Sequence, residues 1–232
     1  MTRTLEELGY AVTTLDVRPE CKADFTVDIR SWKYWTTCRP GDFEIIWASI
    51  PCTEFSQALT TRDRDLRTAD SIARRTLKII RWLKPKQFFI ENPAGCSLLQ
   101  HRRYMQKIAK IRVDYCQFQP SWGYKKPTYI FGSVENLKDV TCQPETCKAM
   151  TPEKSRHKIW LGAYGFPISR NMKFRVPKNL VEYLCTGKRE DLKTMTYRDE
   201  MNRKEMLTAG ATSQNGKKKG ESQRRILNRR LS

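Results

Sequence analysis

Residues 43–56, FEIIWASIPCTEFS, decide the fold and mark a candidate site. The stretch opens with an apolar run, residues 43–48, whose aromatic and β-branched content suits a buried parallel strand. Proline cannot donate to a sheet ladder, so Pro51 ends this strand and leaves Cys52 just beyond its carboxyl end. Open α/β sheets bind their ligands at that edge. A free cysteine more often fills an apolar gap, so a second feature is needed.

A second strand end of the same kind follows in residues 87–93, QFFIENP, where Glu91 comes after a short apolar run. Between the two strands, residues 69–83 carry apolar side chains at helical spacing, with arginines and lysines between them. Strand, helix and strand form a right-handed crossover. We therefore expect Cys52 and Glu91 at the same edge of adjacent parallel strands, where a thiol beside a carboxylate indicates a site.

The order Pro51-Cys52 and then Glu91-Asn92 resembles the cytosine carbon-5 DNA methyltransferases, and the strings ASIPCTEFS, FFIENPAG and YKKPTYIFG resemble their compact phage and virus-type members. The resemblance implies an α/β fold, the doubly wound Rossmann-like sheet of S-adenosylmethionine-dependent methyltransferases. It also implies that Cys52 attacks carbon-6 of a flipped cytosine while Glu91 holds the N3 and amino edge. Carbon-5 needs this activation because cytosine is too electron-poor to accept a methyl group directly.

The same resemblance implies a target-binding set. A predicted hairpin, with strands at residues 113–118 and 129–132, carries basic residues that approach the cytosine O2 and the backbone. The expected target-binding residues are Pro51, Ser56, Asn92, Lys125, Lys126 and Thr128. The arginines of residues 53–67 would either meet phosphates or form a solvated loop balanced by neighbouring aspartates.

For the cofactor, S-adenosylmethionine, the resemblance implies acidic residues after two successive strands. Asp16 would accept from the ribose hydroxyls and Asp28 from the adenine amino group; alternatively, each aspartate simply ends a strand. The family's glycine-rich turn and the strand before it do not precede the helix expected at residues 2–8. We therefore expect a sheet lacking its first strand, from a chain that is a fragment, a mis-started reading frame or a degenerate relative.

Composition supports a polyanionic partner, since 44 Lys and Arg against 25 Asp and Glu give a formal net charge of +19. DNA is the expected partner, and RNA is an alternative. Residues 1–187 are expected to form the methyltransferase domain, with a short target-recognition insert at about 133–170, and residues 188–232 a disordered basic tail. No apolar run reaches membrane-spanning length and no secretory signal opens the chain. Localisation is expected to be intracellular: nuclear in a eukaryotic host, otherwise cytoplasmic.

The cysteines leave one further question open. Cys142 and Cys147, with His157 ten residues on, provide three ligands for zinc, one fewer than a structural site uses, so no metal is expected. Cys116 is assigned to strand packing, and a helix is expected around residues 100–111.

The predicted function is DNA cytosine carbon-5 methylation through a Cys52 thiolate adduct. The alternatives are a catalytically silent nucleic-acid-binding remnant of such an enzyme and an RNA cytosine methyltransferase.

Overall fold

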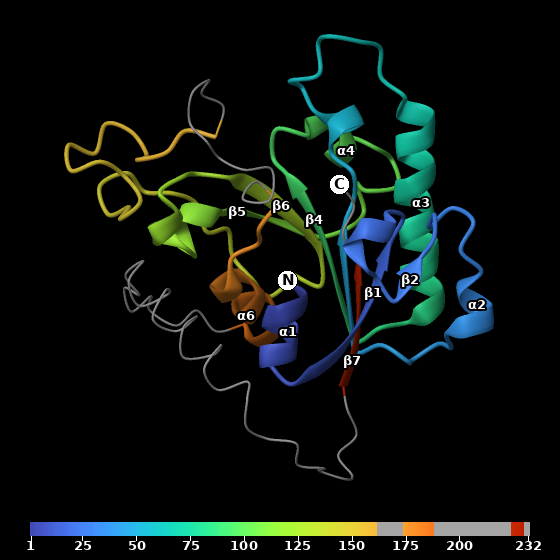
Figure 1. The fold of residues 1–232 in the computed structure, drawn as a ribbon. Helices are drawn as coiled ribbons and strands as arrows, with labels where there is room; N and C mark the ends of the chain where they lie inside the picture. The colour runs from blue at the N-terminus through green and yellow to red at the C-terminus, as the bar shows by residue number, and fades with distance from the viewer. Residues whose placement is uncertain (162–173, 188–223, 230–232) are drawn as a thin grey trace.

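The computed structural model describes residues 1–161 and 174–187, together with the backbone of residues 224–229. In this part of the chain one mixed sheet has the strand order β2-β1-β7-β3-β4-β6-β5 (Figure 1). The strands are β1 (Tyr10–Asp16), β2 (Phe25–Thr26), β3 (Ile45–Ser49), β4 (Gln87–Pro93), β5 (Lys110–Asp114), β6 (Pro127–Gly132) and β7 (Arg224–Arg229). The helices are α1 (Thr2–Glu7), α2 (Tyr34–Thr37), α3 (Leu66–Leu83), α4 (Ser97–Gln100) and α6 (Lys178–Thr186).

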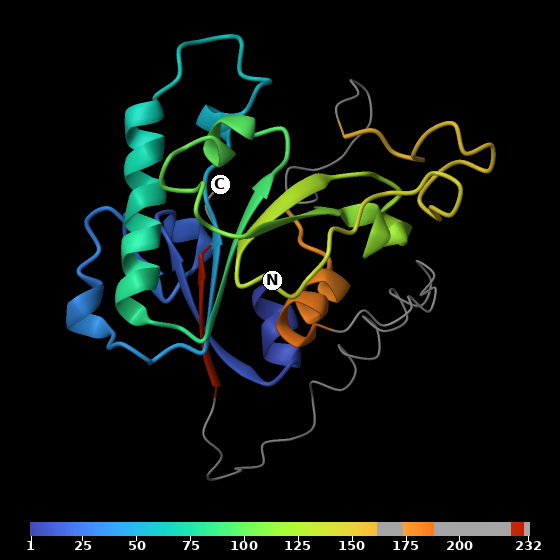
Figure 2. The ribbon, with the colours of Figure 1, turned by 180° about the vertical axis from the view of Figure 1, so that it is seen from behind.

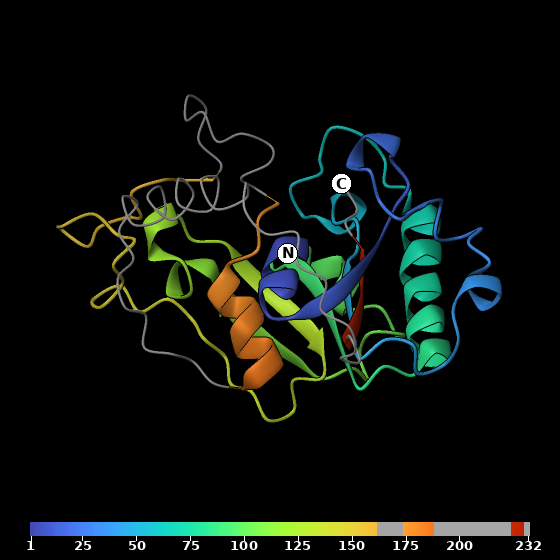
Figure 3. The same cartoon turned by 60° about the horizontal axis from the view of Figure 1, so that its bottom comes forward.

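Helices cover both faces of the sheet, which makes three layers. Helix α3 lies against one face, and α1 and α6 lie against the other (Figures 2 and 3). Five of the six residues that the apolar spacing of α3 predicted are buried, whereas the sixth, Ile72, is half-buried and Ala69 is buried as well. The five are Ala73, Thr76, Ile79, Ile80 and Leu83. The Asp65 side chain accepts from the Thr68 amide at 3.0 Å and caps the start of α3. The α/β fold class is thus as expected.

The crossover predicted from the two apolar runs is present. Strands β3 and β4 are adjacent and parallel, with Ser49 paired to Glu91, and α3 connects them. Both strands are buried over most of their length because helices cover both faces. Cys52 and Glu91 therefore come to the same edge of the sheet, as the sequence indicated.

The central position of the sheet differs from the expectation. Strand β7 lies between β1 and β3 and pairs in parallel with both, so the sheet has a strand where the missing first strand would leave a gap. The prediction of a disordered tail is wrong for Arg224–Arg229, which form a strand. The other tail residues, 188–223 and 230–232, lie outside the described residues. Pairing satisfies backbone groups of β1 and β3 that would otherwise be left unpaired in the middle of a sheet.

The predicted hairpin forms the far edge of the sheet. Strand β6 is antiparallel to both β4 and β5, and α6 packs on the face that α1 also covers. Gly132 ends β6 with φ +127°, and a β-carbon there would lie 2.1 Å from the Phe88 carbonyl oxygen. Only glycine fits this close approach.

The expected helix at residues 100–111 is wrong. Helix α4 ends at Gln100, tight turns follow, and β5 begins at Lys110. None of the described helices is long and apolar enough to cross a membrane.

Candidate active site

Cys52 lies three residues beyond the end of β3 and is the N-cap residue of the short 3-10 helix η2 (Thr53–Phe55). The Asn92 side-chain amide, from the end of β4, donates to the Ile50 carbonyl at 3.1 Å, and Phe55 N donates to the Cys52 carbonyl at 3.1 Å. Asn92 is buried, so this bond fixes the peptide that leads into Pro51. The half-buried Cys52 thiol is consequently held on a rigid turn.

The environment of Cys52 favours the thiolate. A hydrogen bond from the Cys96 side chain is the main cause that lowers the pKa of Cys52 from its ordinary value to about 7. Burial and the Glu91 carboxylate oppose this change, whereas the Lys126 ammonium supports it. Near neutral pH a substantial share of Cys52 is thus a nucleophilic thiolate.

Glu91 is buried at the end of β4, beside Cys52, and two donors contact its Oε1 atom. Tyr115 Oη lies 3.1 Å away, and Lys126 Nζ lies 3.3 Å away. Burial, followed by the nearby Glu91 charge, raises the pKa of Tyr115 well above its ordinary value, so the phenol stays a donor. Among the described residues, no donor contacts the other oxygen, Oε2.

The two hairpin lysines contact different carboxylates. Lys126 points to Glu91, whereas Lys125 Nζ lies 3.2 Å from the Asp114 carboxylate at the end of β5. Thr128 is fully buried, and its hydroxyl donates to the Lys126 carbonyl at 3.2 Å. Of the three, Lys126 is the one that contacts the Glu91 carboxylate, and its charge also helps to lower the pKa of Cys52.

Ser56 follows η2 and lies near the site, but it makes no hydrogen bond to Glu91 among the described residues. Its hydroxyl accepts from Ala58 N at 3.2 Å, and its hydrogen bond with Cys96 places it next to the partner of Cys52. The Ser56 carbonyl accepts from Arg64 at 2.8 Å. Arg64 therefore holds the loop after Cys52 closed on itself, and Arg62 pairs with Glu54.

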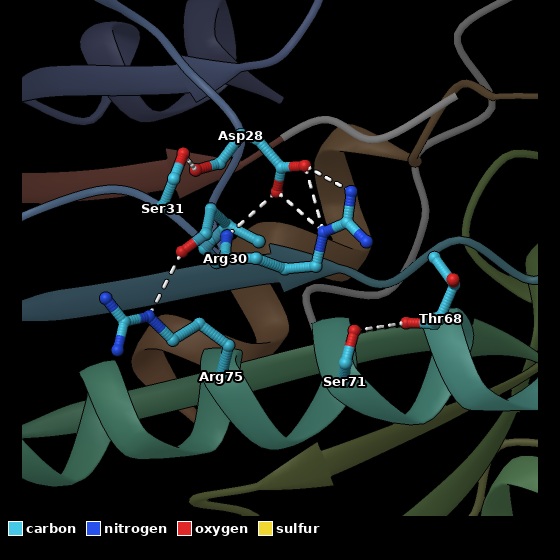
Figure 4. Close-up of polar contacts among 7 residues, drawn as sticks. Asp28, Arg30, Ser31, Thr68, Ser71 and Arg75 are labelled. Carbon is cyan, nitrogen blue, oxygen red and sulfur yellow. Dashed lines mark hydrogen bonds and ion pairs between the residues drawn. The ribbon is translucent and has the colours of Figure 1, made fainter.

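The two predicted cofactor residues have different surroundings. Asp16 is buried at the end of β1, and its Oδ1 accepts from Arg18 N at 2.9 Å. Its Oδ2 is buried and has no hydrogen-bond partner among the described residues. Asp28 instead pairs with Arg30 through both carboxylate oxygens, with Nη2 of Arg30 2.6 Å from Oδ2 (Figure 4).

Two residues of the site were not identified from the sequence. Tyr115 begins the 3-10 helix η3 (Tyr115–Gln117), which the sequence assigned to a strand. Cys96 follows β4, and its amide donates to the Pro93 carbonyl at 2.9 Å. A signal for Cys96 was its place three residues beyond the Glu91-Asn92-Pro93 strand end.

Comparisons with known proteins add independent findings. A family model described as C-5 cytosine-specific DNA methylase matches residues 22–118, which include Cys52 and Glu91. A Frog virus 3 (isolate Goorha) protein named "Probable DNA (cytosine-5)-methyltransferase" is 30% identical over 193 residues, covering 75% of this chain and 87% of that protein. No solved structure is significantly similar to the chain.

Proposed function

Because the chain belongs to the C-5 cytosine-specific DNA methylase family and is thus a DNA cytosine-5 methyltransferase, we propose that Cys52 is its nucleophile and Glu91 the residue that holds the target base. The observation that supports this most is their meeting at one sheet edge, with the pKa of Cys52 lowered to about 7. A thiolate and a buried carboxylate at that place suit covalent activation of a base.

In the proposed reaction the Cys52 sulfur forms a bond to carbon-6 of the cytosine, and the electron pair of the C5–C6 double bond moves to carbon-5. S-adenosylmethionine supplies the methyl group when bound. Transfer of the carbon-5 proton to a water molecule then restores the double bond and expels Cys52 as a thiolate. The protein gains and loses no atoms over the cycle. The cytosine must leave the helical stack to reach the half-buried thiol.

Glu91 orients the ring during addition. Its Oε1 is held by Tyr115 and Lys126, which fixes the carboxyl plane, and Oε2 is directed to the amino edge of the base in this proposal. Lys126 adds a positive charge close to the position where negative charge develops on the ring. Pro51, Asn92 and Thr128 shape the turn and the strand on which these groups stand.

The described residues fit the adenosine part of S-adenosylmethionine at one point. The unpartnered, buried Oδ2 of Asp16 is an acceptor in need of a donor, and a ribose hydroxyl is such a donor. For Asp28, the adenine amino group would share a carboxylate that already accepts from Arg30 through both oxygens.

DNA is the proposed polymer, in keeping with the family and with the net charge of +19. Backbone phosphates are contacted by cations without sequence readout. The trapping experiment includes an RNA substrate, so it also tests cytosine methylation of RNA.

The test is covalent trapping. A DNA duplex with 5-fluorocytosine at target positions, incubated with the protein and S-adenosylmethionine, should give an adduct on Cys52, because fluorine does not leave as a proton does. Peptide mass spectrometry would locate it. The Cys52→Ala variant should give no adduct, whereas Cys185→Ala, which removes a distant half-buried thiol, should retain it.

An adduct on another cysteine would contradict the assignment of the nucleophile. A fluorinated RNA of the same sequence serves as the second arm. Trapping on RNA alone would replace DNA by RNA as the substrate, while methyl transfer to DNA without a dependence on Cys52 would refute the mechanism.

A further inference from the structure

Four metal-ligating side chains converge at a place that the proposed reaction does not use. Cys116, Cys142, Cys147 and His157 present ligand atoms that all lie within 4.8 Å of one another. The Nε2 atom of His157 lies 3.5 Å from the Cys142 sulfur and 3.6 Å from the Cys147 sulfur. The fourth ligand, Cys116, comes from η3, so spacing along the chain does not reveal it.

The two distances from His157 Nε2 to the sulfurs of Cys142 and Cys147 match a tetrahedral metal site. With Zn–S near 2.3 Å and Zn–N near 2.0–2.1 Å, tetrahedral angles place sulfur and nitrogen about 3.6 Å apart. Cys116 and Cys147 are buried, and Cys142 and His157 are half-buried. From this geometry we propose that Cys116, Cys142, Cys147 and His157 bind one Zn²⁺ in a closed, four-protein-ligand site. A site with four protein ligands has no open position, so its role is structural.

Backbone hydrogen bonds already form the loops that bring the ligands together. Cys147 N donates to the Gln143 carbonyl at 2.9 Å, which curls the chain between Cys142 and Cys147. An antiparallel bridge pairs Met150 with His157 and turns the histidine back toward the sulfurs. Cys142 N donates to the Asp114 carboxylate at 2.8 Å and anchors the loop to β5.

The surrounding charges suit a three-thiolate zinc site, which carries one net negative charge. Lys125 Nζ lies 3.2 Å from the Asp114 carboxylate, which also accepts from Cys142 N. The Lys154 ammonium lies 2.9 Å from the Cys147 carbonyl oxygen. Lys125 and Lys154 therefore lie beside the loops that carry Cys142 and Cys147, where the excess negative charge of a three-thiolate site would stand.

The loop segment after β6, which carries Cys142, Cys147 and His157, also needs the cross-link that a bound metal would provide. After β6 the chain runs as loops beyond the sheet edge, drawn in yellow in Figure 1. Its local apolar cluster consists of Cys116, Cys147, Ala149 and Met150, with Cys142 packed beside them. So small a core does not order a loop segment, and proteins commonly supplement such segments with a metal. Zinc would join this segment to η3, whose first residue, Tyr115, contacts Glu91. The metal thus supports the part of the chain where the short target-recognition insert was expected.

The experiment measures metal in the full chain. Protein produced with zinc supplementation and purified with a non-thiol reductant and no chelator should contain about one Zn²⁺ per chain by inductively coupled plasma mass spectrometry. Protein prepared with Co²⁺ instead should show the intense visible bands of tetrahedral cobalt and thiolate-to-cobalt charge transfer. In Cys116→Ser the charge-transfer intensity should fall by roughly one third, because two of three thiolates remain.

Matched controls are Cys38→Ser and Cys185→Ser, which lie outside the cluster and should keep the full metal content. If a variant that removes a ligand does not fold, His157→Cys gives a second measurement. It replaces the histidine by a fourth thiolate and should still bind zinc. Wild-type protein with less than about a tenth of an equivalent of metal after supplementation under reducing conditions would overturn the proposal. A cobalt spectrum unchanged in Cys116→Ser would also overturn it, as would a Cys142–Cys147 disulfide that persists under these conditions.

Discussion

Replacing Cys96 by alanine should move the pH dependence of methylation to higher pH. The Cys96 hydrogen bond is the largest cause that lowers the pKa of Cys52 from 9.0 to about 7, while burial and Glu91 act in the opposite direction. Two pKa units correspond to about 2.7 kcal/mol of preference for the thiolate. Since the thiolate is the reactive form, loss of the donor raises the pKa and reduces the reactive fraction at neutral pH.

The expected result for Cys96→Ala is a rise of about one to two pH units in the midpoint of the kcat/KM profile. Activity at pH 7 should fall about 10-fold or more and recover most of its value near pH 9. Methyl transfer to DNA measured across this range, together with the alkylation rate of Cys52 followed by mass spectrometry, would give two independent readings of the same titration.

Two variants separate this role from simple packing. Cys96→Ser keeps a donor and should restore a profile close to that of the wild type, whereas Cys38→Ala removes another buried cysteine from the same apolar cluster and should leave the midpoint in place. A uniform loss of activity in Cys96→Ala at every pH, with an unchanged midpoint for Cys52 alkylation, would refute the reasoning.

Three further predictions concern the support of the site and of the sheet. Tyr115→Phe removes a buried donor to Glu91 and should lower kcat/KM by about 10- to 100-fold, as hydrogen bonds to charged groups contribute about 1.5–3 kcal/mol; an unchanged value would show that Lys126 alone positions the carboxylate. Gly132→Ala forces a β-carbon onto a backbone oxygen and should destabilise folding by more than about 3 kcal/mol. The matched control is Gly9→Ala, because Gly9 has φ +86° but open space around it, and this change should lower the free energy of unfolding by only about 1–2 kcal/mol. Equal losses for Gly132→Ala and Gly9→Ala in chemical denaturation would contradict this. Leu227→Pro removes a ladder donor from β7 and should cost more than about 3 kcal/mol, unlike Leu227→Val; a cooperative thermal transition at the wild-type temperature would show that β7 is dispensable.

The part of the fold that follows from local pattern was predictable. The apolar runs of β3 and β4 and the helical spacing of α3 each lie within one short stretch, and the crossover rule then brings Cys52 and Glu91 to one edge. The residue types at those two strand ends carried the resemblance to the family. That much of the site needs no long-range information.

The rest depends on contacts between distant segments. The string RRILNR of β7 lacks the apolar run of a central strand, and its place is determined by the ladder groups of β1 and β3. Cys116 lies far from Cys142 along the chain, so a search for closely spaced ligands misses it. The apolar spacing of Met105, Ile108 and Ile111 imitates a helix, yet the chain there makes successive turns with hydrogen bonds between residues i and i+3 before β5 begins.

The position of β7 also sets an order of assembly during synthesis. Strand β7 follows every other described element along the chain, yet it lies between β1 and β3. Until residues 224–229 leave the ribosome, the pair β2-β1 and the group β3-β4-β6-β5 share no backbone ladder, and each exposes an unpaired edge. The nascent chain therefore passes through a stage at which the unpaired edges of its two sheet fragments can bind chaperones or the same edges of another nascent copy. The complete sheet therefore forms only with this last strand, at the end of translation of these elements rather than gradually along it.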